Sequence, residues 1–116
     1  MTAIRSVTTS EAPLEVWQPE GVTVLDGNPH GHGFTLFEQT VGPAFATGVF
    51  ACQPSTTTYE LTSNEIIYVL QGSVSIALDG QEAVELTTGD LALLPKGHQS
   101  TWTFHTPFKE VWFLVD

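Results

Sequence analysis

The chain has 116 residues, which is the size of one domain. It carries 3 Lys and Arg residues against 13 Asp and Glu residues, for a formal net charge of −10. Binding to nucleic acid or to an anionic membrane surface requires clustered cations, and the composition does not provide them. Hydrophobic residues make up 41% of the chain and charged residues 14%, which is too apolar for a disordered acidic segment. We therefore expect a globular domain with no nucleic-acid partner and no membrane partner.

The single cysteine, Cys52, cannot form a disulfide within the chain or a cysteine-based zinc site. The first 17 residues lack the apolar core of a signal peptide. No segment approaches the roughly 20 apolar residues that a membrane helix needs. These features predict a cytoplasmic protein.

Residues 1–20 are polar and interrupted by Pro13 and Pro19, and we interpret them as an N-terminal arm. Residues 21–116 are predicted to form a single domain. Apolar residues in this region recur with a period close to two, and Asp79-Gly80 is typical of a hairpin turn. We count eight or nine short strands and no helix, which favours an all-β antiparallel sandwich or barrel. The strand segments are 34–40, 47–53, 56–61, 65–72, 73–80, 81–90, 91–95, 100–106 and 109–116.

His30 and His32 lie in a Gly-rich loop at residues 28–33. One interpretation is a surface metal site or a flap over the pocket of a neighbouring subunit. The other is a solvent-exposed turn, which we favour because no third ligand lies nearby in the sequence.

Two motifs in this order resemble those of the cupin superfamily. Residues 89–97, GDLALLPKG, match the second cupin motif, G-x5-P-x-G, and Glu65 with Gly72 matches the end of the first, E-x6-G. The resemblance implies a cupin (RmlC-like) jelly-roll barrel of antiparallel strands. Segments 26–29, 48–50 and 97–102 are similar to those of small single-domain cupins related to (S)-ureidoglycine aminohydrolase.

The resemblance also identifies the positions at which cupins hold a metal. In this chain they fall on Tyr59, Leu61, Glu65 and Ser100, or, in a longer spacing, on Thr58 and Glu60 in place of the first two. Of the first four, only Glu65 is a good ligand for a divalent transition metal. We therefore expect a degenerate site and no cofactor. If Mn, Ni, Zn or Fe is bound, the ligands to test are Glu60, Glu65 and His98.

Strand alternation predicts a pocket of aromatic and aliphatic side chains around one carboxylate, which suits a small organic ligand. Desolvation raises the pKa of a carboxyl in such a place, so Glu65 is a candidate general acid or base, with Tyr59 and His98 as catalytic partners. The alternative is a structural carboxylate bonded to neighbouring groups. The predicted lining is Tyr59, Leu61, Glu65, Ile67, Ser100, Trp102 and Phe104.

Three hypotheses follow. The first is a small-molecule binding module, for which the net charge favours a neutral or cationic ligand. The second is an enzyme, either a metal-dependent hydrolase resembling (S)-ureidoglycine aminohydrolase or a metal-free isomerase that uses Glu65. The third is a structural homodimer with a vestigial pocket. The resemblance implies a homodimer through exchange of N-terminal strands. Trp17 lies on the Pro-flanked arm, where we expect it to pack against the second subunit.

Overall fold

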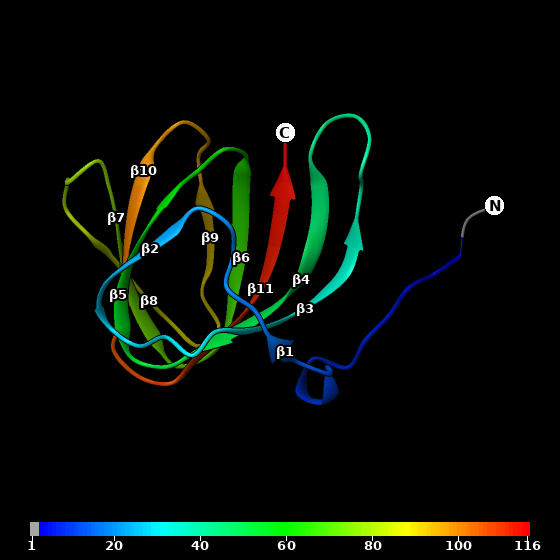
Figure 1. Ribbon diagram of the computed structural model, residues 1–116, viewed down its shortest axis with the longest axis horizontal. Helices are drawn as coiled ribbons and strands as arrows, with labels where there is room; N and C mark the ends of the chain where they lie inside the picture. Colours follow the sequence, from blue (N-terminus) through cyan, green and yellow to red (C-terminus); the bar gives the residue numbers. More distant parts are fainter. Residues whose placement is uncertain (1–2) are drawn as a thin grey trace.

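The computed structural model describes residues 3–116 and consists of two antiparallel sheets that lie face to face (Figure 1). The first sheet has the order β1-β3-β4-β11-β6-β9 and the second has the order β2-β5-β10-β7-β8. The strands of the first sheet are β1 (Glu15–Val16), β3 (His32–Glu38), β4 (Phe45–Cys52), β6 (Asn64–Gln71), β9 (Leu91–Leu94) and β11 (Phe108–Val115). Those of the second are β2 (Val22–Gly27), β5 (Ser55–Glu60), β7 (Ser73–Leu78), β8 (Val84–Thr87) and β10 (Gln99–Phe104).

This arrangement confirms the predicted all-β jelly roll. Residues 3–116 contain eleven strands, more than the eight or nine expected, together with one helical turn, η1 (Thr9–Glu11). The additional strands are β1, which has only two residues, and β2, whose side chains are nearly all exposed. Both lie at a sheet edge, where little is buried, so neither shows a clear apolar alternation. Among the described residues, no helix is long and apolar enough to cross a membrane.

The predicted turn residues lie where the backbone requires them. Asp79 and Gly80 have φ of 52° and 71° between β7 and β8, as a tight hairpin turn demands. Gly72, between β6 and β7, has φ of 86°, and a side chain there would collide with the carbonyl oxygen of Pro107. These turns set the strand register that decides which side chains point between the sheets.

The segment before β2 folds onto its own chain. Strand β1 pairs with β3, and Trp17 stacks on Trp112 with ring centroids 6.0 Å apart and an interplanar angle of 29°. Trp17 also meets the Phe50 ring edge-on at 5.8 Å. Trp17 therefore has aromatic partners within its own chain, and its packing against a second subunit stays a prediction.

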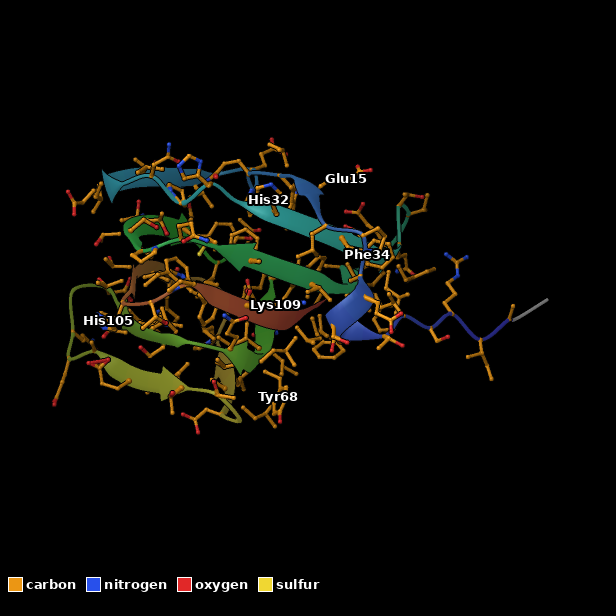
Figure 2. The ribbon with its side chains drawn as sticks, turned by 90° about the horizontal axis from the view of Figure 1, so that it is seen from below. Glu15, His32, Phe34, Tyr68, His105 and Lys109 are labelled. Carbon is orange, nitrogen blue, oxygen red and sulfur yellow. The ribbon has the colours of Figure 1, made fainter. Side chains whose placement is uncertain are left out.

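Lys109 holds this segment from the outer face of the first sheet. Its Nζ donates a hydrogen bond of 2.7 Å to the carbonyl oxygen of Thr9 in η1, and Figure 2 labels Lys109 beside this helical turn. Residues 3–8, which precede η1, extend away from the two sheets (Figure 1).

Gly48 of β4 is required by the ring of Trp112. A Cβ at this position would lie well inside the contact distances of the Trp112 ring and the carbonyl oxygen of Phe34. We expect Gly48→Ala to lower the free energy of unfolding by about 1–3 kcal/mol through overpacking. Thermal denaturation followed by circular dichroism measures this change. Thr40→Ala, at an exposed position after β3, is the control, and an unchanged melting temperature for Gly48→Ala would contradict the assignment.

Candidate functional site

A cavity of about 710 Å³ lies between the two sheets. Its walls include six aromatic rings and five glutamates, and none of its described lining residues is Lys, Arg or His. The three tryptophans of the chain all belong to it. The aromatic residues are Trp17, Phe50, Tyr59, Trp102, Phe104 and Trp112, and the glutamates are Glu20, Glu38, Glu60, Glu65 and Glu110. The cavity is therefore both aromatic and acidic.

Two of these glutamates are buried on neighbouring strands. Glu65 of β6 is 7% exposed and Glu110 of β11 is 3% exposed. Burial raises the pKa of Glu65 to about 7. Burial, and next the negative charge of Glu65, raise the pKa of Glu110 well above its ordinary value. The pair therefore holds at least one proton at neutral pH.

Two buried polar atoms of β11 have no hydrogen-bond partner among the described residues. They are Oε1 of Glu110 and Nε1 of Trp112. Both residues line the cavity, and both project from the same face of the strand because they are two positions apart. Leaving a buried polar atom without a partner costs about 1–3 kcal/mol. Two residues that line the cavity thus each carry a buried polar atom that the described residues leave unsatisfied.

Several residues predicted from the sequence line the cavity. Tyr59 of β5 and Trp102 and Phe104 of β10 form part of the aromatic wall, with Trp102 and Phe104 stacked at 5.9 Å. Burial, followed by the charge of Glu65, raises the pKa of Tyr59. Glu60 also lines the cavity and is exposed. Strand alternation placed these side chains correctly because β5 and β10 pair in regular register.

Three other predicted lining residues are not among those that border the cavity. Leu61, Ile67 and Ser100 are at most 1% exposed and belong to the packed interior. The Ser100 hydroxyl donates to the Tyr59 carbonyl oxygen at 2.5 Å and accepts a hydrogen bond of 2.8 Å from Nε1 of Trp102. Ser100 therefore positions the Trp102 ring of the aromatic wall, and its own side chain lies in the packed interior, where a bound molecule does not reach it.

His98, proposed as a catalytic partner, points elsewhere. Its Nδ1 lies 2.5 Å from Oδ2 of Asp79, and both side chains are substantially exposed. His98 follows Gly97, which has φ of 91°, so it lies in the turn rather than in the alternation of β10. The structure therefore does not bring His98 together with Glu65 and Tyr59.

The residues present do not fit a cupin metal centre. Of the four family positions, Leu61 offers no donor atom and the Ser100 hydroxyl is already engaged on both sides, so Glu65 is the one strong ligand. Within residues 3–116, no group of three or more His, Cys, Asp or Glu side chains is arranged to hold a metal ion. The alternative set of Glu60, Glu65 and His98 accordingly does not assemble.

The histidines of the Gly-rich loop lie outside the cavity lining. His30 is exposed and adopts a left-handed φ of 42°. The backbone N–H of His30 donates a hydrogen bond to Oδ1 of Asn28. His32, labelled in Figure 2, lies with its Nδ1 2.7 Å from the carbonyl oxygen of His30. This local hydrogen bonding is typical of a structured turn.

Sequence reasoning missed Glu110, Trp112, Trp17 and Phe50 as site residues. The sequence contained a signal for the first two, because Glu110 alternates with the apolar residues Phe108 and Trp112. In the structure all three side chains are buried on one face of β11. Glu110 is a carboxyl on the apolar face of a strand, which by itself indicates a buried titratable group.

The buried carboxyls predict an unusual dependence of stability on pH. Since the pKa of Glu65 is raised from 4.5 to about 7 on folding, the folded chain binds more protons than the unfolded chain in this window. The free energy of unfolding therefore falls as the pH rises from 4.5 to about 7, and the raised pKa of Glu110 extends the fall upward. Asp79 and Asp116 have lowered pKa values and act in the opposite sense, below pH 3.8.

We expect the melting temperature to fall by roughly 5–10 °C between about pH 5 and about pH 8. Glu110→Gln, which removes one titrating group, is expected to reduce this fall by about half. Glu82→Gln makes the same change of charge at an exposed loop position and serves as the control. Melting curves with equal pH dependence in the two variants would show that Glu110 is not the group responsible.

Comparisons with known proteins agree with this architecture. Residues 41–112 match the model of the EutQ-like cupin domain. The protein named acetate kinase EutQ from Clostridioides difficile (strain 630) is 33% identical over 73 residues, which cover 61% of this chain and 46% of that protein. The match therefore spans about half the length of this relative.

Two solved structures resemble the chain over nearly its whole length. A protein of unknown function from Rhizobium leguminosarum superposes with a TM-score of 0.70 at 18% identity, over 98% of each chain. The cupin domain of Cnp3 from Schizosaccharomyces pombe gives a TM-score of 0.71 at 12% identity, over 96% of this chain and 74% of that one. At these identities the likeness shows the fold alone. With the family match over residues 41–112, it establishes that the chain belongs to the EutQ-like cupin family.

Proposed function

We propose that the chain is a binding protein for a small organic molecule, which it holds in the cavity between the two sheets. The observation that carries this proposal is a pair of unpartnered buried atoms, Oε1 of Glu110 and Nε1 of Trp112, in two residues that line the cavity. A protein that uses the cavity only as packing space gains nothing from leaving both atoms unsatisfied. The volume of about 710 Å³ also lies in the range of small-molecule sites.

An acid–base enzyme is the second candidate, and the raised pKa of Glu65 favours it. A carboxyl that titrates near neutral pH can both accept and donate a proton. Tyr59 and Glu110 surround the same cavity and would complete a metal-free isomerase. A hydrolase of the (S)-ureidoglycine aminohydrolase type is less well supported, because its metal positions fall on Leu61 and Ser100.

A screen of small fragments tests the binding function. All three tryptophans line the cavity, so intrinsic fluorescence reports its occupancy directly. We expect fragments from at least one class of neutral, cationic or anionic compounds to give a saturable change. Glu110→Gln should weaken this binding by about 1–3 kcal/mol, whereas Glu82→Gln should leave it unchanged. No saturable response from any of the three classes would overturn the proposal.

A cytoplasmic homodimer is also part of the proposal. The outer face of the first sheet carries two rows of uncharged side chains, which is unusual in a chain with a net charge of −10. A second copy meets the least repulsion at this face, and several of these residues are exposed. The rows are formed by Leu93, Ile66 and Phe113 and by Leu91, Tyr68 and Val111.

Multi-angle light scattering measures the mass of this assembly in solution. We expect the wild-type chain to elute with the mass of a dimer and Leu91→Asp to elute as a monomer, because the new charge is buried without a partner on association. Val24→Asp, which places the same charge at an exposed position of β2 in the other sheet, should remain dimeric. A monomeric wild-type chain, or a dimeric Leu91→Asp variant, would contradict this interface.

A further inference from the structure

We propose that the molecule held in the cavity is an organic ammonium ion that also carries a neutral oxygen atom. This inference rests on the proposed binding function and specifies the class of ligand for the same site. It follows from the charge of the cavity wall, from the two unpartnered atoms and from the spacing of their residues along the strand.

The charge of the wall selects a cation. Five glutamates line the cavity, and none of its described lining residues carries a positive charge. Two of them, Glu65 and Glu110, are more than nine-tenths buried, where water screens their charges least. A bound anion would face repulsion from every charged group on the wall, whereas an ammonium ion would be attracted by all of them.

The aromatic rings of the wall favour the same class. Trp17 and Trp112 are stacked at 6.0 Å, and the edge of Phe50 meets Trp17 at 5.8 Å. Trp102 and Phe104 form a second stack on the opposite sheet. The faces of such rings attract ammonium groups by about 0.5–2 kcal/mol each when water is excluded.

The two unpartnered atoms specify the polar groups of the ligand. Once an ammonium ion displaces the proton of the pair, Oε1 of Glu110 accepts a hydrogen bond and is therefore matched by an ammonium N–H. Nε1 of Trp112 only donates, so its partner is an oxygen of the ligand, such as a hydroxyl. One molecule that carries both groups would satisfy both atoms.

The strand spaces the two residues that carry these atoms. Glu110 and Trp112 are two residues apart on β11, and such positions are about 7 Å apart along a strand. A chain of about five carbons between nitrogen and oxygen matches this spacing of the residues. The remaining volume of the cavity lets longer or branched members of the class bind as well.

Four aliphatic compounds of matched length test the inference. They are ω-aminopentanol, pentylamine without the hydroxyl group, the neutral α,ω-pentanediol and the anionic ω-hydroxypentanoate. Binding is measured by tryptophan fluorescence and by isothermal titration calorimetry. We expect ω-aminopentanol to bind at least about tenfold more tightly than the diol, pentylamine to lie between them, and ω-hydroxypentanoate not to bind.

Two variants test whether the Glu110 carboxylate and the Trp112 N–H cause the preference for ω-aminopentanol. Glu110→Gln should remove most of the preference for ω-aminopentanol over the diol, because the amide carries no charge. Trp112→Phe keeps an aromatic ring and removes the N–H, so it should abolish the advantage of ω-aminopentanol over pentylamine. Circular dichroism confirms that both variants fold, and Glu82→Gln is the matched control for the change of charge.

Proton release provides an independent readout. Because the buried pair holds a proton at neutral pH, binding of an ammonium ion should expel it, and calorimetry in buffers of different ionisation enthalpy should detect this release. The dissociation constant should therefore fall as the pH rises from about 6 to about 8. The other titratable groups that line the cavity are Tyr59, Glu20, Glu38 and Glu60, and Cys52 lies close enough to Glu110 for its pKa to respond to that charge.

The outcomes separate the two proposals. Tighter binding of the diol or of ω-hydroxypentanoate would overturn the ammonium inference and leave the binding function standing. The ammonium inference also fails, and the binding function stands, if none of the four compounds binds while other fragments do. If no fragment of any class binds, the binding function and the ammonium inference both fail.

Discussion

The structure depends on the burial of two carboxyl groups, Glu65 and Glu110, on adjacent strands of one cavity wall. Two negative charges in this environment repel each other and lose their hydration, so the folded chain keeps at least one of them protonated. This burial lowers stability at neutral pH, and only protons or a positively charged ligand restore it. A fold maintained for packing alone has no reason to carry this cost.

The rest of the cavity is arranged around that pair. Trp17 enters from the N-terminal segment, and Gly33 and Gly48 lack the side chains that would displace its ring and that of Trp112. Ser100 receives the indole N–H of Trp102 and fixes the second aromatic wall. Each of these contacts places a ring at the edge of the cavity without filling it, so the interior remains open in front of the carboxyls.

The fold was largely predictable because its determinants are local. A period of two, together with turn residues such as Asp79-Gly80, is a property of neighbouring positions, and the sequence contains both. The site was predictable only in part. Tyr59 and Trp102 followed from alternation on regular strands, whereas Trp17 reaches the cavity through a fold-back of the N-terminal segment that no local pattern encodes. Glu110 was missed because the metal positions of the family lie on β5, β6 and β10 or directly beside them, whereas Glu110 lies on β11.

The missing metal ligands and the second buried carboxyl, Glu110, both determine how the negative charge of Glu65 is compensated. Where cupins of the metal-binding type place imidazoles, this chain has Leu61 in the packed interior and a Ser100 hydroxyl already bonded on both sides. A metal cation would otherwise compensate the buried negative charge of Glu65. In this chain the second carboxyl, Glu110, increases that charge, so the compensating positive group has to come from protons or from the bound molecule. An organic cation, as proposed above, would supply the positive charge that a metal ion supplies in cupins of the metal-binding type.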